Sequence, residues 1–227
     1  CIAIGENTMY DSTGMHRSIA IGNEALRYHT GTGDERNVCV GDQAGYNNTT
    51  GYNITHIGGK AGYLSTTGNF NTYIGHQAGA NMTTGDYNIC IGINSNSSSN
   101  SSDGQCTFGD SNIGGIRCNV QTISSLSDKR DKTEIMDLPI GLDFIKKLTP
   151  RKFKWASRDG NIKDGKYEAG FVAQELQAVE SSTSVDYLDL VLADNPDKLE
   201  ASYGKLVPVL VKAVQELSAE VNALKSK

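Results

Sequence analysis

Residues 58–74 read GGKAGYLSTTGNFNTYI, and this 17-residue pattern recurs through the N-terminal half of the chain. Each copy begins at a glycine that follows an aliphatic or aromatic residue, and successive glycines lie 17 residues apart except for one interval of 19. These glycines are Gly5, Gly22, Gly41, Gly58, Gly75, Gly92 and Gly109. Such regularity is typical of a fold in which each copy is one structural unit that buries its apolar face only against its neighbours.

A short apolar run precedes these glycines, for example Ile19-Ala20-Ile21, Val38-Cys39-Val40 and Thr72-Tyr73-Ile74. The residue directly before the glycine is always Ile, Val or Phe, whereas the residue two before it varies among Ala, Cys, His, Tyr and Thr. Side chains alternate between the two faces of a strand, so these positions lie on opposite faces. We expect the constant aliphatic position to be packed and the variable position to be tolerant.

Small residues recur at two fixed offsets after Gly41, Gly58 and Gly75, as Ala-Gly pairs at 44–45, 61–62 and 78–79 and as Thr-Thr-Gly triplets at 49–51, 66–68 and 83–85. Glycine at a fixed offset suits the corners of a tightly wound coil, where φ turns positive or backbone approaches backbone. The pattern predicts an N-terminal β-solenoid or β-roll with a thin shared core. Residues 94–104, rich in Ser and Asn, are either a flexible linker or an exposed loop that replaces the Ala-Gly corner.

The composition changes at Ser127-Asp128-Lys129-Arg130-Asp131-Lys132. Upstream lie most of the 25 glycines and no proline; downstream lie all four prolines, the only tryptophan (Trp155) and most of the 21 Lys and Arg residues. This boundary predicts two domains, a repeat domain over 1–126 and a second domain over 127–227.

The net charge of −5 and the lack of a basic stripe argue against a nucleic-acid binder. No apolar run reaches the roughly 18 residues of a membrane span.

The five cysteines form no CxxC pair, and we expect small buried side chains rather than disulfides. None of the four histidines pairs with Cys, Asp or Glu at metal-ligand spacing, so we predict no metal site and no cofactor. The chain starts at Cys1 without a signal-peptide pattern, and we expect it to be a fragment of a longer protein.

The second domain combines helical and strand patterns, which predicts an α+β fold. Apolar spacing indicates a helix over 137–148 with Asp137 as N-cap, strands over 152–155 and 166–172, a short helix from Ala173, and another strand over 186–193. The chain ends in a heptad stripe of strict 3-4 spacing, formed by Val207, Leu210, Val214, Leu217, Val221 and Leu224. A narrow stripe of this kind is suited to a partner helix in a coiled coil. The alternative is a terminal helix that packs on its own domain.

The repeats resemble those of phage tail-fibre proteins and, more distantly, the β-roll heads of trimeric autotransporter adhesins, in which three rolls pack around one axis. Four blocks of the second domain resemble the endosialidase-type intramolecular chaperone of phage tail spikes and fibres. They are 127–132, 144–155, 170–175 and the segment from Tyr203 through the terminal helix. The resemblance implies a homotrimer whose chaperone domain drives folding of the preceding β-domain and then cuts itself off.

The same resemblance places a nucleophile on Ser127 and its base on Lys132. Ser127 would attack the carbonyl of Leu126, and water would resolve the ester. This is a self-cleaving serine endopeptidase of one turnover with no external substrate. Ser-Lys pairs are a known variant of triad chemistry, and the lysine must be neutral to act as the base. Asp128 and Arg130 are expected to position the loop or to brace a neighbouring chain. Without the resemblance, this segment would read as a solvated charged linker.

These features favour the C-terminal part of a phage tail fibre, assembled in the host cytoplasm and located in the virion. The alternative is a bacterial trimeric surface adhesin head with a non-cleaving coiled-coil trimerisation domain. A glycan-degrading tailspike is disfavoured because no Asp/Glu pair is convincingly placed for glycosidic cleavage. A host-surface glycan or protein receptor is a candidate partner. Four tyrosines could stack on sugars or be structural: Tyr28, Tyr46, Tyr63 and Tyr73.

Overall fold

The computed structural model describes residues 1–14, 16–33, 35–119, 123–158, 160 and 162–226. The chain divides into two compact units, Cys1–Gly114 and Gly115–Lys227, and each unit is described by itself.

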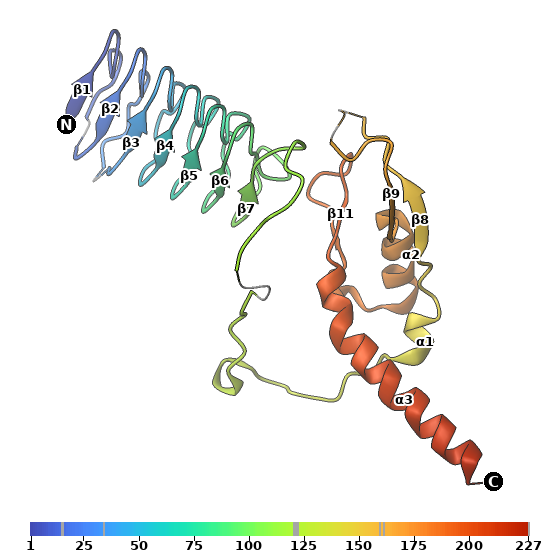
Figure 1. Cartoon of the computed structure of the whole chain (residues 1–227). Coiled ribbons are helices and arrows are strands. Elements are labelled where there is room, and N and C mark those ends of the chain that lie inside the picture. Colours follow the sequence, from blue (N-terminus) through green and yellow to red (C-terminus); the bar gives the residue numbers. More distant parts are fainter. Residues whose placement is uncertain (15, 34, 120–122, 159, 161, 227) are drawn as a thin grey trace. The chain divides into compact units, whose positions relative to one another are not determined.

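The first unit is a β-solenoid in which each repeat forms one coil and contributes one three-residue strand (Figure 1). The strands form one parallel sheet in chain order and in register, so that Ile57 lies beside Ile74 and His56 beside Tyr73. The predicted β-solenoid is thus confirmed. The strands are β1 (Ile2–Ile4), β2 (Ile19–Ile21), β3 (Val38–Val40), β4 (Thr55–Ile57), β5 (Thr72–Ile74), β6 (Ile89–Ile91) and β7 (Cys106–Phe108).

The two faces of this sheet are the reverse of the expectation. The variable middle residue of each triplet points into the coil: Cys39, His56 and Tyr73 are completely buried. The constant residue before the glycine points outward, and Ile57 and Ile74 are each 38% exposed. Period-two alternation separates the two faces, but it does not say which face is the interior. The prediction that the constant aliphatic position packs inside the coil was therefore wrong.

The Ala-Gly corner lies opposite the inward side chain, and this explains its glycine. Gly79 has φ +60 and Gly62 has φ +61, in the left-handed region that favours glycine. A methyl group on Gly79 would overlap the Tyr73 ring, and one on Gly62 would overlap the His56 ring. The interior is therefore narrow at these coils, and the thin predicted core follows from this close approach.

A ladder of buried asparagines replaces much of the apolar core. Asn71 donates from Nδ2 to the Gly85 carbonyl at 2.7 Å, and its Oδ1 accepts the amide N–H of Asn88 at 2.8 Å. Asn37 and Asn88 repeat this arrangement in other coils. Each amide links neighbouring coils and satisfies buried backbone groups that would otherwise destabilise the interior.

Residues 94–104 belong to the solenoid, as the loop alternative predicted and the linker alternative did not. Ser95 and Ser102 are buried, and the Ser95 carbonyl accepts the amide N–H of Gly79 at 2.7 Å.

The five cysteines differ in burial. None of the five forms a disulfide; Cys39 and Cys90 are buried as expected, whereas Cys1, Cys106 and Cys118 are exposed, which the prediction of burial missed.

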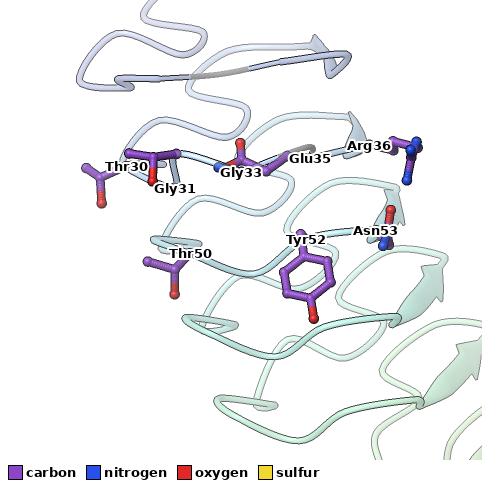
Figure 2. A pocket seen from close by; sticks show the side chains of 9 residues that line it. Thr30, Gly31, Gly33, Glu35, Arg36, Thr50, Tyr52 and Asn53 are labelled. Carbon is purple, nitrogen blue, oxygen red and sulfur yellow. The ribbon is translucent and has the colours of Figure 1, made fainter.

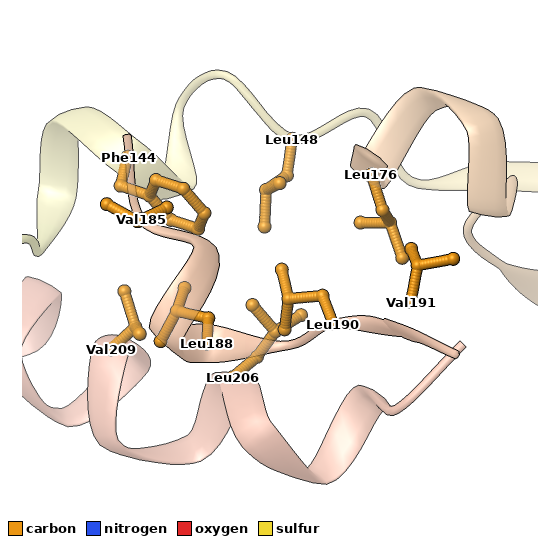
Figure 3. Close-up of a cluster of buried hydrophobic side chains, with 9 residues drawn as sticks. All are labelled: Phe144, Leu148, Leu176, Val185, Leu188, Leu190, Val191, Leu206 and Val209. Carbon is orange, nitrogen blue, oxygen red and sulfur yellow. The ribbon is translucent and has the colours of Figure 1, made fainter. Parts of the chain in front are cut away.

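The second unit is a mixed α/β fold with one compact apolar cluster. Two antiparallel pairs of strands, β8 with β9 and β10 with β11, accompany three α-helices and three short 3-10 turns. Figure 3 shows the buried cluster, which gathers Phe144, Leu148, Leu176, Val185, Leu188, Leu190, Val191, Leu206 and Val209. The elements are η1 (Lys129–Asp131), α1 (Leu142–Ile145), β8 (Arg151–Lys154), β9 (Tyr167–Gly170), α2 (Ala173–Thr183), η2 (Asp186–Leu188), β10 (Val191–Leu192), β11 (Glu200–Ala201), η3 (Tyr203–Leu206) and α3 (Val207–Lys225).

Two boundaries differ from the sequence-based expectation. The helix expected from Asp137 begins at Leu142, because Pro139 and the non-helical Gly141 precede it. Its first amide, on Leu142, donates to Glu216 Oε2 of α3 at 2.7 Å, so the cap comes from a distant residue. The strand expected over 186–193 is confined to β10, because η2 occupies its first half. The strands over 151–154 and 167–170 and the start of α2 at Ala173 agree with the prediction.

The terminal helix α3 packs on its own unit through Val209 and Ala213, which are buried. The heptad residues point away and are 40–69% exposed: Val207, Leu210, Val214, Leu217, Val221 and Leu224. The helix thus packs on its own domain, as the alternative predicted, but through another face, and the heptad stripe stays exposed in the single chain. In the described part of the chain, no helix has the length and apolarity needed to cross a bilayer.

Candidate functional site

The segment around Ser127 is an exposed strand-free stretch interrupted by one short turn. Side chains from 123 to 137 are all exposed, and Leu126 is 99% exposed. The turn η1 follows Ser127 directly because Asp128 caps it: Asp128 Oδ1 accepts the amide N–H of Arg130 at 2.9 Å. Asp is among the residues that prefer this capping position.

This turn brings the two predicted catalytic side chains together. Lys132 Nζ donates to Ser127 Oγ at 2.6 Å, although five positions separate the residues in the sequence. The amide N–H of Lys132 donates to the Lys129 carbonyl at 3.2 Å, which closes the turn. A nucleophile and its base must lie within hydrogen-bond reach, and this pair does.

The two predicted supporting residues form a bidentate pair within the same turn. Arg130 donates from Nε to Asp128 Oδ1 at 3.1 Å and from Nη2 to Asp128 Oδ2 at 2.7 Å. The Arg130 guanidinium lowers the pKa of Asp128, and the carboxylate in turn raises the pKa of Arg130. Both side chains are exposed, so the pair adds little to stability. The pair lies within the turn between Ser127 and Lys132.

The chemistry also needs an environment that the single chain lacks. An amine in water is protonated at neutral pH, and a lysine becomes a base only when burial or neighbouring cations favour its neutral form. Every described side chain from 123 to 137 is open to solvent. The single chain therefore provides the contact between Ser127 and Lys132 but not the burial.

The first unit carries a separate concavity of about 550 Å³ (Figure 2). It lies at the coil with the 19-residue interval between Gly22 and Gly41, whose two extra residues widen the corner. The interval was the only sequence signal of this site, and it did not predict a cavity. Lining residues include Thr30, Gly31, Gly33, Arg36, Thr50, Tyr52 and Asn53.

A buried cluster of hydrogen-bonded side chains lies at this corner. His29 lies with Nε2 2.7 Å from Glu35 Oε2 and with Nδ1 2.6 Å from Asn48 Oδ1, and all three side chains are buried. Gly33 also donates its amide N–H to Glu35 Oε1 at 3.1 Å. The sequence-based expectation concerned only metal-ligand spacing and did not address this hydrogen bond between residues six positions apart.

The four candidate sugar-stacking tyrosines have different roles. Tyr28, Tyr46 and Tyr63 form an aromatic column on successive coils, with ring centroids 5.1 and 5.2 Å apart. Tyr73 is completely buried and stacks on His56 at 4.7 Å, so it is structural and cannot reach a ligand. Tyr52, which the sequence-based reasoning missed, is 39% exposed and lines the concavity.

Residues 127–186 match the profile of a peptidase family described as the chaperone of endosialidase. The match starts at Ser127 and extends through β8, β9 and α2 to the start of η2, and it leaves α3 outside. No curated protein and no solved structure matched the chain. The part of the second unit from Ser127 to Asp186 is therefore similar to the chaperone of endosialidase, and it follows a β-solenoid in the chain.

Proposed function

With residues 127–186 matching the chaperone of endosialidase, we propose that this chain is the C-terminal part of a phage tail fibre that assembles as a homotrimer. The domain over 127–227 aligns three repeat domains and then releases itself by cleavage between Leu126 and Ser127. Assembly takes place in the host cytoplasm, and the repeat unit remains in the virion.

The observation that carries this proposal is the 2.6 Å contact between Lys132 Nζ and Ser127 Oγ at the first matched residue. Neutral Lys132 takes the proton of the Ser127 hydroxyl, and Oγ attacks the Leu126 carbonyl. The peptide C–N bond breaks, the amine of Ser127 takes the proton, and an ester joins Leu126 to Ser127 Oγ. Water hydrolyses the ester and leaves a carboxylate on Leu126 and a new N-terminus at Ser127.

Because this site is exposed in the single chain, we expect the reaction to occur only after the copies have assembled. Burial that favours neutral Lys132 must come from surfaces outside the isolated chain, and neighbouring copies supply such surfaces on assembly. The exposed stripe of α3 gives the copies a contact. Alternating Val and Leu in a heptad by itself favours two strands, so the rest of the assembly must set the number at three.

The solenoid explains why an alignment device is useful. Its coils are nearly identical, and a strand paired one coil out of step would still meet similar side chains. A domain that holds three chains in register before the coils stack prevents this error. Cleavage afterwards makes assembly irreversible, because that domain no longer exchanges with its product.

Intact mass measurements on the purified full chain test the proposal. Wild-type protein should give two fragments that meet at Leu126/Ser127, whereas Ser127→Ala and Lys132→Ala should stay whole. Lys129→Ala, which removes a lysine from the same turn, is the matched control and should be cut normally. If both active-site variants are processed like the wild type, the assignment of the pair is wrong. A stable trimer that is never cut would favour the adhesin-head alternative.

A second function, binding of a host-surface glycan, is favoured by the concavity at the widened corner. It combines the partly exposed ring of Tyr52 with the hydroxyls of Thr30 and Thr50 and the amide of Asn53. Sugars bind through such combinations of an aromatic face and hydrogen-bonding groups. Glycan-array binding should be lost in Tyr52→Ala and kept in Tyr10→Ala, which removes an exposed tyrosine of another coil. Equal binding by both variants would exclude this site.

A further inference from the structure

The outward face of the sheet β1–β7 carries two columns of side chains. The last residue of each strand forms an unbroken apolar column: Ile4, Ile21, Val40, Ile57, Ile74, Ile91 and Phe108. The parallel in-register pairing places each of these residues beside its equivalent on the next coil. The first residues form the second column: Ile2, Ile19, Val38, Thr55, Thr72, Ile89 and Cys106. Together these two columns are called the outer strip.

The outer strip is continuous and mostly apolar, and its residues are exposed or half-buried. Ile57 is 38% exposed, Ile91 37% and Phe108 55%, and neither column contains a charged residue. With strands about 4.8 Å apart, the strip is roughly 30 Å long. Monomeric proteins rarely leave a continuous apolar surface of this kind in water, and such surfaces usually mark an interface.

The constant residue type along the last column of the strip indicates which partner packs on it. The middle strand residue, which points into the coil, differs in size from Ala20 to Tyr73 between coils. This is possible because the corner opposite it fits the inward residue of its own coil. Outside, the last position of each strand stays Ile, Val or Phe although no packing within the solenoid requires it. A partner that meets every coil alike must repeat at the same spacing along the same length. The outer strip of another copy has that spacing and length.

We propose that the outer strip is the surface through which copies of this chain pack on one another, parallel and in register. The inference rests on the proposed homotrimer for the number of copies and adds the face that holds the repeat units together. Every residue of the strip lies within Cys1–Gly114. This contact therefore persists in the product after the domain over 127–227 is cut away.

Disulfide trapping in the full chain tests the contact. In a background with the exposed Cys1, Cys106 and Cys118 changed to Ser, a single Ile57→Cys is introduced and mildly oxidised. Parallel in-register packing brings residue 57 of one copy to residue 57 of another, so a covalent dimer should appear on a non-reducing denaturing gel. The matched control is Leu64→Cys, on the same coil and 40% exposed, which should stay monomeric. Ile74→Cys repeats the test one coil further along, should Ile57→Cys fail to fold.

The outcomes separate this inference from the proposed function. An oligomeric chain in which neither Ile57→Cys nor Ile74→Cys links better than Leu64→Cys overturns the outer strip as the interface and leaves the chaperone proposal standing. Efficient linking in a chain that is never cut at Leu126 supports the strip and removes the autoproteolysis. A chain that is monomeric at all concentrations overturns both.

Discussion

The two units of this protein build their interiors in different ways. The first buries small clusters of apolar side chains within its coils, with asparagine amides between coils, whereas the second gathers large aliphatic side chains and Phe144 into one cluster. An interior of the first kind depends on its neighbours, because each coil is covered only by the next. An interior of the second kind is complete within its own unit. The difference indicates that the second unit can form first and then guide the first.

The largest effect is expected at a corner of the solenoid. Gly79→Ala places a methyl group into the Tyr73 ring at φ +60, and both the overlap and the backbone strain oppose it. We expect a loss of about 3 to 5 kcal/mol in the stability of the coil. Hydrogen exchange of β5 and its neighbours measures this loss. Gly204→Ala in the second unit meets open space and should be nearly neutral; an equal effect at both glycines would contradict the contrast.

The core of the second unit gives the next effect. Leu190 is completely buried in the cluster of Figure 3, so Leu190→Ala should lower the free energy of unfolding by about 3 kcal/mol. Denaturant unfolding of the cleavage-blocked Ser127→Ala chain measures it. Leu224→Ala, at an exposed position, should change stability by less than about 0.5 kcal/mol. Similar losses in both variants would mean that the cluster is not the core.

Acid distinguishes the two interiors, because all four histidines lie in the first unit. Burial lowers the pKa of His56 from 6.5 to about 3, and neither ring nitrogen has a hydrogen-bond partner. The unfolded chain therefore binds a proton below pH 6.5 that the folded coil does not, and stability falls as pH falls towards 3. The loss from this one group is about 2 kcal/mol between pH 7.5 and pH 5, at about 1.4 kcal/mol per pH unit.

His56→Phe should remove that slope, since the ring keeps its stack on Tyr73 and cannot be protonated. The measurement is thermal unfolding of the solenoid across this pH range. His76→Gln, at an exposed histidine, should leave the slope in place. A pH dependence that survives in His56→Phe would show that another group carries it.

The smallest effect on stability is expected on the outer face of α3. Val214 is 65% exposed, so Val214→Glu should change unfolding of the second unit by less than about 0.5 kcal/mol. The same change should abolish self-association through the heptad stripe, because a charge would be buried between helices. Light scattering measures this against Ser218→Glu, which adds the same charge elsewhere on the helix. Unchanged association in Val214→Glu would exclude the stripe as a contact.

Local patterns predicted much of this architecture, and distant contacts account for the rest. The repeat spacing fixed the coils and the positions of β1–β7. Alternation could not tell the interior from the outer strip, because both sides of a three-residue strand are mostly apolar. The start of α1 depends on Glu216, which lies far along the chain from Leu142. The contact between Ser127 and Lys132 depends on a cap only one residue from Ser127, but the pair was expected only from the family resemblance, because the segment alone reads as a charged linker.

The central claim is that the domain over 127–227 aligns the repeats and then cuts itself off once copies have assembled. Intact mass spectrometry of the full chain, incubated over a range of protein concentrations, tests it most directly. The account predicts products that end at Leu126 and begin at Ser127, formed faster as concentration rises and absent in Ser127→Ala. Products at another bond, or a rate of cutting that does not depend on concentration, would contradict it.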